Sequence, residues 1–301
     1  MSSEFRAGGT DLSERYRSGV SRGALVDLER SEEVTGIAWG ADGAARIGAL
    51  VTIATIAGDA RLRQGYPGLA AAAGGLATPE IRAIGTIGGN LAQRSRCWYY
   101  RNPHTSCLKK GAPLCPARSG NHLYGVVFDL GPCVAPHPST LGAALLAYGA
   151  VLHTDRRRLG IADLFGDGGD GTVDNRLAEG ERIVSIAMGA PLAKERAVYR
   201  RAIGRAYAEW PLVEIVVRAV IEDGRFAVIR IAAGGVAPVP LHLSAAEAAL
   251  EGKAIDPTAL RLAAALAIAG SKALPQTGYK LQLLEELLID VLERVASSRT
   301  L

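Results

Sequence analysis

All four cysteines of this 301-residue chain lie in one short segment. Disulfides normally join distant segments and are rare in cytoplasmic proteins, so thiols crowded together indicate a metal or cluster site. Zinc sites usually contain closely spaced cysteine pairs, which are missing here, whereas wide spacing suits a loop wrapped around a [4Fe–4S] cluster. Zinc and free thiols remain the alternatives. The candidate ligands are Cys97, Cys107, Cys115 and Cys133.

The same segment is rich in positive charge. An iron–sulfur core bound by four thiolates carries negative charge, which neighbouring cations would offset. The candidate cations are Arg94, Arg96, Arg101, Lys109 and Lys110.

Two other segments each contain a pair of glycines between small polar residues. They read AGGTDL over residues 7–12 and TIGGN over residues 86–90. Paired glycines let the backbone come close to a phosphate, so that successive N–H groups point at its oxygens. Each segment alone is explained as well by a tight turn, but two such loops together predict a clamp around a pyrophosphate.

Composition excludes several classes of protein. Hydrophobic residues make up 49% of the chain and charged residues 21%, which excludes disorder over its whole length and allows two domains. The net charge of +4 is too small to indicate a nucleic-acid partner. No apolar stretch reaches the roughly 18–20 residues of a membrane span. The first residues contain no apolar run, so we expect a cytoplasmic protein, with export in the folded state beside a signal-bearing partner as the alternative.

The pattern of apolar residues predicts an α+β fold with a change of character near residue 194. Before it, we expect strands and helices to alternate, followed by a long surface loop over residues 163–181. The strands are expected at 24–28, 45–50, 151–154 and 182–188, and the helices at 52–60, 66–76, 79–82 and 141–148.

After residue 194 the pattern predicts an antiparallel sheet followed by helices. Asp223-Gly224 between two β-branched runs, 213–222 and 225–233, indicates a hairpin. A capping box from Ser244 to Glu247 and the pair Asp256-Pro257 each predict the start of a helix. A last helix is expected over 281–295.

In their order along the chain, these motifs resemble the flavin-binding (medium) subunit of the molybdenum hydroxylases. This family includes xanthine dehydrogenase, aldehyde oxidoreductase and carbon monoxide dehydrogenase. The resemblance rests on AGGTD, TIGGN, the cysteine segment and His137-Pro138-Ser139 before an apolar helix, and it continues through 76–85, 199–205 and 234–240. The cysteine segment resembles the branch with an extra [4Fe–4S] cluster, nearest the periplasmic aldehyde oxidoreductases.

The resemblance implies two domains. Residues 1–190 would form an FAD-binding domain of vanillyl-alcohol-oxidase (PCMH) type, with an iron–sulfur loop over 94–134. Residues 194–301 would form a C-terminal α+β domain like that of carbon monoxide dehydrogenase flavoproteins, with an antiparallel sheet and helices. Residues 3–6, which read SEFR, stand where the family has an apolar strand.

The resemblance also implies which residues hold the cofactors. Leu76 and Ala77 would line the FAD pocket, and Ile183 would contact the flavin. Thr140 follows Ser139 where the family has a Ser-Asp pair, and Arg201 stands where the family has lysine. The four cysteines would ligate the cluster. The FAD pyrophosphate would lie against Arg6, Ala7, Gly8, Gly9, Thr10, Asp11, Leu12, Thr86, Gly88, Gly89 and Asn90.

The function implied is that of an electron-transfer subunit in a heterotrimer, without a catalytic residue of its own. A large subunit would oxidise an aldehyde or a xanthine-type substrate at its molybdenum cofactor. Electrons would pass through the [2Fe–2S] centres of a small subunit to the FAD of this chain, and then to an external acceptor. The alternatives are a free-standing FAD oxidoreductase and a non-catalytic, zinc-binding assembly protein. Neither nucleic acid nor a membrane span is expected.

Overall fold

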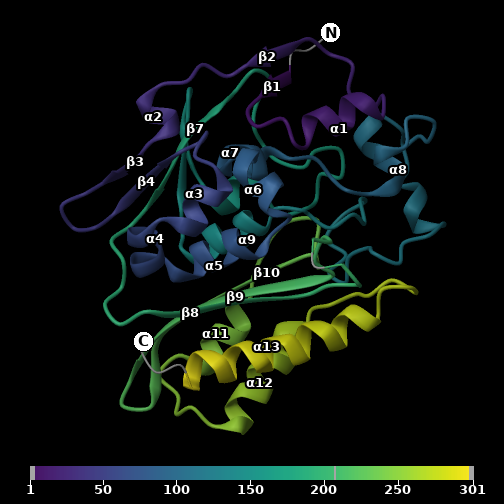
Figure 1. Ribbon diagram of the computed structural model, residues 1–301. Helices are drawn as coiled ribbons and strands as arrows, with labels where there is room; N and C mark the ends of the chain where they lie inside the picture. Colours follow the sequence, from purple (N-terminus) through teal and green to yellow (C-terminus); the bar gives the residue numbers. More distant parts are fainter. Residues whose placement is uncertain (1–3, 207, 298–301) are drawn as a thin grey trace.

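The computed structural model describes residues 4–206 and 208–297. Two larger antiparallel sheets alternate with layers of helices, as Figure 1 shows, so the expected α+β class is confirmed. The predicted domain ranges begin and end in residues 1–3 and 298–301, which lie outside the described part. Among the described helices, none is both long enough and apolar enough to cross a membrane.

A small strand–helix–strand unit opens the chain. Strand β1 (Glu4–Arg6) pairs in parallel with β2 (Leu25–Asp27), and helix α1 (Leu12–Arg17) lies between them in sequence. Residues 4–6 therefore do form a strand. Across the pair, the Arg6 guanidinium donates to the Asp27 carboxylate at 2.5 and 2.7 Å on the exposed side.

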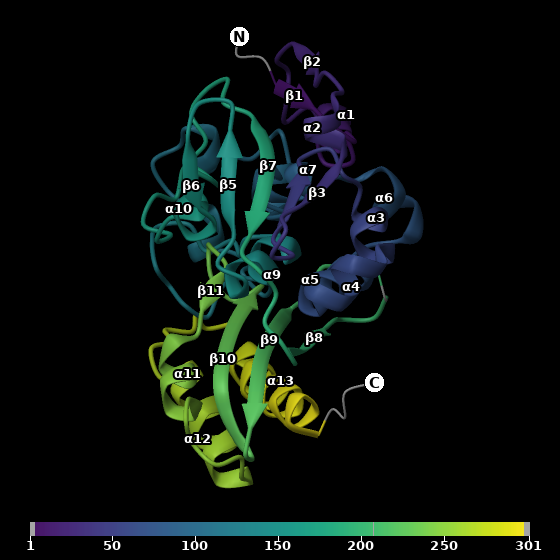
Figure 2. The same cartoon turned by 90° about the vertical axis from the view of Figure 1, so that its left-hand side faces the viewer.

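The first larger sheet has the strand order β3-β4-β7-β5-β6, and all its neighbours are antiparallel. Figure 2 shows it standing above the second sheet. Three of its strands are close to the predicted ones, whereas the two three-residue edge strands were missed. The strands are β3 (Ile37–Trp39), β4 (Ala45–Gly48), β7 (Ile183–Met188), β5 (Val151–Thr154) and β6 (Arg158–Gly160).

Short helices surround the first sheet, with α5 and α9 packed between it and the second sheet, and several begin at a hydroxyl side chain. Thr52, Thr78, Thr86 and Ser139 each accept a hydrogen bond from the backbone N–H three residues on, which satisfies a donor that the first turn leaves free. The helices are α2 (Glu32–Thr35), α3 (Ile53–Gly58), α4 (Ala60–Gly65), α5 (Pro67–Gly75), α6 (Pro79–Ile84), α7 (Ile87–Ala92), α9 (Thr140–Ala147) and α10 (Ile161–Phe165). Helix α10 includes residues 163–165, so the predicted surface loop over 163–181 is helical at its beginning.

The cysteine segment contains little regular structure. It is a long excursion between α7 and α9, and its only described elements are α8 (Trp98–Arg101), η1 (Leu108–Lys110) and η2 (Pro116–Arg118). Backbone hydrogen bonds to the C-terminal half, such as that from the Val127 N–H to the Val236 carbonyl oxygen at 2.9 Å, hold it in place together with side-chain contacts.

The second sheet is an antiparallel meander in the order β11-β10-β9-β8, with three helices on its outer face (Figure 1). The predicted hairpin is confirmed, because Asp223 and Gly224 both have positive φ angles, +48° and +70°, as a tight two-residue turn requires. The elements are β8 (Arg196–Ala202), β9 (Val213–Glu222), β10 (Arg225–Gly234), β11 (Leu241–His242), α11 (Ser244–Leu250), α12 (Pro257–Ile268) and α13 (Tyr279–Ser297).

The start of α12 was predicted correctly, whereas the start of α11 was predicted at the right residue for the wrong reason. Asp256 caps α12 by accepting from two backbone N–H groups. Helix α11 does begin at Ser244, but the capping box is wrong. Glu247 turns instead into the core, where it accepts from the Ile231 N–H at 2.5 Å and pairs with His242 at 2.6 Å.

A buried carboxyl group joins the two halves of the molecule. Glu214 on β9 is 1% exposed, and one of its oxygens accepts from the Thr140 hydroxyl of α9 at 2.8 Å and the Tyr199 hydroxyl of β8 at 2.9 Å. Burial raises the pKa of Glu214 to about 7, because the charged form loses its hydration.

We expect this group to make stability fall as pH rises. The pKa of Glu214 is higher in the folded state than in the unfolded state, so folding takes up a proton at any pH between these two pKa values. The free energy of unfolding therefore decreases across this range, until the folded carboxyl has lost its proton above pH 7. From pH 4.5 to 8, the unfolding free energy of the wild type should fall by roughly 3 kcal/mol relative to Glu214→Gln. Urea unfolding of the apoprotein measures this. Glu222→Gln, at the exposed end of the same strand, should follow the wild type, and identical pH slopes in all three proteins would refute the assignment.

Candidate functional site

The two double-glycine segments meet at one cavity of about 270 Å³. One follows β1 and the other forms the first turn of α7, so residues nearly 80 positions apart face each other. Helix α6 ends beside the first segment, which brings the two together. Of the predicted cofactor-binding residues, those lining the cavity are Ala7, Gly8, Gly9, Thr10, Asp11, Leu12, Thr86, Gly88, Gly89 and Ile183.

Close backbone packing explains the glycines. A Cβ atom on Gly8 would lie 2.1 Å from the Ile84 carbonyl oxygen, and one on Gly88 would lie 2.9 Å from the Ala49 carbonyl oxygen and Cβ. Gly9 has a φ of +73°, in the left-handed region that other residues rarely adopt. The glycines thus let two backbone segments approach each other and leave a space between them that no side chain fills.

An acidic residue faces the same cavity with unused hydrogen-bonding capacity. One oxygen of Glu4 accepts from Arg15 at 2.5 Å. The other, Oε2, is buried and has no partner among the described residues. An unpaired buried acceptor costs free energy unless a ligand hydroxyl or amine donates to it. A sugar hydroxyl of a dinucleotide has the required chemistry, so this part of the cavity fits FAD.

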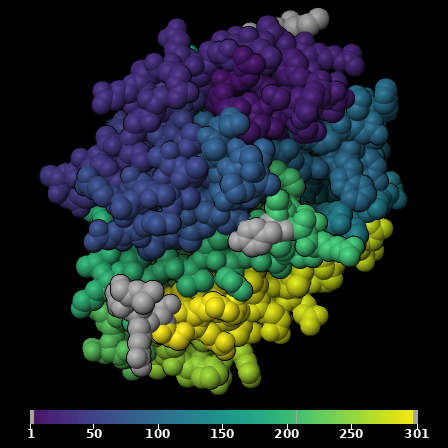
Figure 3. All heavy atoms as spheres, viewed as in Figure 1, coloured from purple at the N-terminus to yellow at the C-terminus, as the bar shows by residue number. Residues whose placement is uncertain are grey.

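Asp11 has a structural role that the motif did not reveal. Its carboxylate pairs with Arg15 at 3.2 Å, Arg96 at 3.0 Å and Arg101 at 2.7 Å, and it accepts from the Arg94 backbone N–H at 3.1 Å. Burial alone would raise the pKa of Asp11, but Arg96, Arg101 and the hydrogen bonds outweigh burial and lower it. The carboxylate therefore ties the first glycine loop to the cysteine segment. In Figure 3 these two parts lie against each other.

A second ion-pair group fixes the far side of the cysteine segment. Asp174 binds Arg94, which lines the cavity, at 2.6 Å and Lys109 at 2.9 Å. Burial opposes the charge of Asp174, yet the two cations lower its pKa to about 2. Asp174 lies in the long polar loop after α10, so this loop also anchors the site.

The remaining predicted residues do not line the cavity. Asn90 accepts from the Ser139 hydroxyl at 2.7 Å. The Gln93 side chain, which lines the cavity, donates to the Asn90 carbonyl oxygen at 2.8 Å. Thr140 donates to Glu214, as described above. Arg6 lies on the exposed pair of strands, bound to Asp27.

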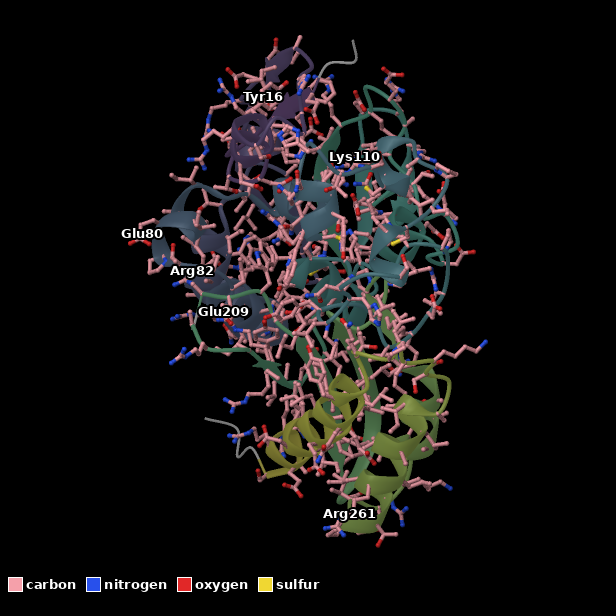
Figure 4. The ribbon with its side chains drawn as sticks, turned by 90° about the vertical axis from the view of Figure 1, so that its right-hand side faces the viewer. Tyr16, Glu80, Arg82, Lys110, Glu209 and Arg261 are labelled. Carbon is pink, nitrogen blue, oxygen red and sulfur yellow. The ribbon has the colours of Figure 1, made fainter. Side chains whose placement is uncertain are left out.

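Leu76, Ala77 and Arg201 also lie away from the cavity. The Arg82 guanidinium donates to the carbonyl oxygens of Leu76 and Ala77, both at 2.8 Å, and Ala77 has a φ of +49°. Arg201 donates to the Glu209 carbonyl oxygen at 3.3 Å. Figure 4 shows Glu209 and Arg82 on the same side of the molecule.

Several residues that line the cavity belong to no motif. They reach it from β1, from α1, from the end of α7 and from the approach to β7, and only the tertiary structure brings them together. They include Glu4, Arg15, Gln93, Arg94, Glu181 and Arg182.

The four cysteines are free thiols within one loop region. Cys115 and Cys133 form a thiol–thiol hydrogen bond, which lowers the pKa of Cys115 and raises that of Cys133. Burial raises the pKa of Cys97, and smaller effects come from its neighbours Cys107 and Cys115, so the region brings all four thiols into electrostatic contact. Within residues 4–206 and 208–297, however, no three His, Cys, Asp or Glu side chains are grouped to hold a single metal ion.

The basic residues of this segment have structural partners of their own. Arg96 and Arg101 bind Asp11 and Glu14, and Lys110 donates to the carbonyl oxygens of Tyr99 and Asn102 at 2.9 and 2.6 Å. Lys110, itself part of this segment, is labelled in Figure 4. The idea that these cations mainly offset the charge of a cluster is therefore not supported.

Comparison with known proteins agrees with this geometry. Residues 2–188 match the model of the FAD-binding domain in molybdopterin dehydrogenase, and residues 197–295 match that of the carbon monoxide dehydrogenase flavoprotein C-terminal domain. The aldehyde oxidoreductase FAD-binding subunit PaoB of Escherichia coli K12 is 31% identical over 261 residues, covering 82% of this chain and 79% of that protein.

Two further likenesses are more limited. A xanthine dehydrogenase FAD-binding subunit of Escherichia coli O157:H7 is 36% identical over 92 residues, which are 28% of this chain and 30% of that protein. A chain of carbon monoxide dehydrogenase from Hydrogenophaga pseudoflava shares the fold, with a TM-score of 0.75, 24% identity, and coverage of 97% of this chain and 88% of that one.

Together, the paired glycine loops, the cavity between them and a family match over most of the chain lead to one conclusion. The protein belongs to the family of FAD-binding subunits of molybdenum hydroxylase-type dehydrogenases, and it is the flavoprotein subunit of an oxidoreductase.

Proposed function

We propose that this chain holds FAD between its two glycine loops and carries electrons within a heterotrimeric molybdenum hydroxylase. It receives them from the [2Fe–2S] centres of a small subunit, after a molybdenum subunit has oxidised an aldehyde or a xanthine-type substrate, and passes them to an external acceptor. The observation that supports this most directly is the cavity formed jointly by residues 7–12 and 86–90.

The residues of the cavity suit a dinucleotide with two negative charges. The glycine backbones leave room for a pyrophosphate, and Arg15 and Arg94, each paired with a carboxylate, place guanidinium groups in the walls. Glu4 accepts from a sugar hydroxyl through Oε2. Bound FAD supplies the redox chemistry, since a flavin exchanges electrons singly or in pairs. The protein's own task is to bind the cofactor and exclude water from its phosphates.

Asn90, Ser139 and Thr140 form the layer behind the cavity. Ser139 donates to Asn90 and caps α9, so the two side chains hold α7 and α9 in a fixed relation. Leu76 and Ala77 remain predicted residues of the FAD pocket, Arg201 a predicted cofactor-binding residue, and Arg6 a predicted contact of the pyrophosphate.

If FAD binds in this cavity, adding one methyl group at Gly8 should strongly weaken FAD binding. In Gly8→Ala, the new Cβ would overlap the Ile84 carbonyl oxygen, so the loop must move and FAD affinity should fall at least about tenfold. The measurements are the flavin content after gel filtration and fluorescence titration of the apoprotein with FAD. Gly74→Ala, where the nearest atom is 3.8 Å from the new Cβ, is the matched control. Equal affinity in both variants would show that FAD binds elsewhere.

We further propose that Cys97, Cys107, Cys115 and Cys133 hold a [4Fe–4S] cluster. In support, all four lie in one loop region and interact electrostatically. A four-iron cluster takes one thiolate per iron and spreads them over its corners, so it does not need the tight grouping of a single-ion site. A structural zinc, as in the assembly-protein alternative, does need that grouping.

Anaerobically purified protein should contain about four irons and four sulfides per chain. Cys107→Ser and Cys133→Ser should each lose most of this iron, because the cluster loses a ligand, while Ser106→Ala should retain it. Iron and sulfide analysis with electron paramagnetic resonance provides the readout. Four thiols that titrate freely in iron-free native protein would contradict the cluster, and one zinc per chain would favour the assembly-protein alternative.

The heterotrimer is tested by purification from the native cells through a tag on this chain. We expect stoichiometric molybdenum and two partner subunits, one of which adds [2Fe–2S] signals, because a flavin subunit of this kind depends on electrons from its partners. Subunit composition by mass spectrometry and metal analysis give the result. A lone flavoprotein that oxidises a substrate by itself would favour the free-standing oxidoreductase instead.

A further inference from the structure

A second cavity, separate from the one between the two glycine segments, lies beside the cysteine segment. It has a volume of about 300 Å³ and is bounded by that segment, by the connection from β8 to β9 and by the start of α13. Among the described residues, none lines both cavities. Its size corresponds to the lower end of small-molecule pockets, enough for one or two fused rings.

The walls of this cavity are aromatic. Trp98 and Tyr124 contact each other with ring centroids 5.6 Å apart, and Trp210 approaches from the β8–β9 connection. All three remain between 43% and 55% exposed, although large aromatic rings gain free energy when they are covered. A planar aromatic ligand would cover them by stacking.

The base of the cavity contains a buried amine without a counter-ion. Lys280 is 1% exposed, and its amine donates to the carbonyl oxygens of Tyr124 at 3.1 Å and Gly235 at 3.0 Å. An ammonium group has three protons, so one donor is left for a ligand. No carboxylate of the described residues pairs with it, and burial lowers the pKa of Lys280 to about 7. An arriving anion would offset the cost of burying the charge.

A second donor lies at the rim. Nε of Arg96 is buried and has no hydrogen-bond partner within the described residues, although the rest of the guanidinium binds Asp11 and Glu14 and stacks on Trp210 at 4.4 Å. His122, in contrast, has both ring nitrogens in contact with backbone groups. Lys280 and Arg96 thus offer cationic donors beside aromatic faces, while the acidic lining residue Glu209 accepts from the Arg205 backbone N–H at 2.9 Å.

We infer that this cavity binds an aromatic carboxylate, with its ring among Trp98, Tyr124 and Trp210 and its carboxylate toward Lys280. The assignment does not require FAD. The relation of this ligand to the reaction rests on the proposed function. Oxidation of an aromatic aldehyde by the complex yields an aromatic carboxylate, so the cavity would bind the type of product that the complex forms.

The test is calorimetric titration of the holoprotein with 2-naphthoate. We expect a Kd of about 1 mM or tighter, and at least about tenfold weaker binding of 2-naphthylmethanol, which keeps the rings but lacks the charge. Lys280→Met should weaken naphthoate binding at least about tenfold, because it removes the charge at similar volume. Trp210→Leu, on an exposed connection where folding is not at risk, should weaken it severalfold. Lys253→Met, at an exposed turn, should bind like the wild type.

Three results would overturn the inference. They are the absence of binding by the wild type, equal binding of the acid and the alcohol, and naphthoate binding that disappears when apoprotein is loaded with FAD. The last result would mean that the flavin ring itself occupies the cavity. Flavin content, measured by absorbance in the same samples, separates failure of this site from failure of FAD binding.

Discussion

The arrangement of the site depends on one carboxylate and three guanidinium groups. Asp11 lies two residues after the first double glycine, and its ion pairs reach Arg15 in the following helix and Arg96 and Arg101 in the cysteine segment. Partly buried charges are costly unless they are paired and hydrogen-bonded, and here every member has several partners. Because this network joins segments some 90 residues apart, it fixes both the glycine loop and a segment with almost no regular structure.

Packing between backbones completes the site. Gly8 rests against the end of α6 and Gly88 against the residue after β4, so part of the cavity wall is main chain. These main-chain atoms cannot change rotamer, which gives a bound cofactor a fixed surface beside the side chains of Glu4, Arg15 and Arg94. The side chains behind them, Asn90 and Ser139, set the spacing of α7 and α9 instead of contacting the cavity.

The sequence allowed the motifs and most regular elements to be predicted, because hydrophobic periodicity, turn residues and helix caps act locally. The hairpin at Asp223-Gly224 and the helix start at Asp256 are examples. What failed depended on tertiary partners. Glu247 has the spacing of a capping box, but the unpaired N–H of Ile231 is a better partner for it in the core. Likewise, Glu4 and Arg94 belong to no motif, and only the folded chain brings them to the cavity.

The opening strand–helix–strand unit has a consequence for biosynthesis. Two strands of three residues each cannot remain paired in water on their own. The loop and helix between them are held by Arg96 and Arg101, which come much later along the chain. We therefore expect residues 4–27 to gain stable structure only after the cysteine segment has been synthesised.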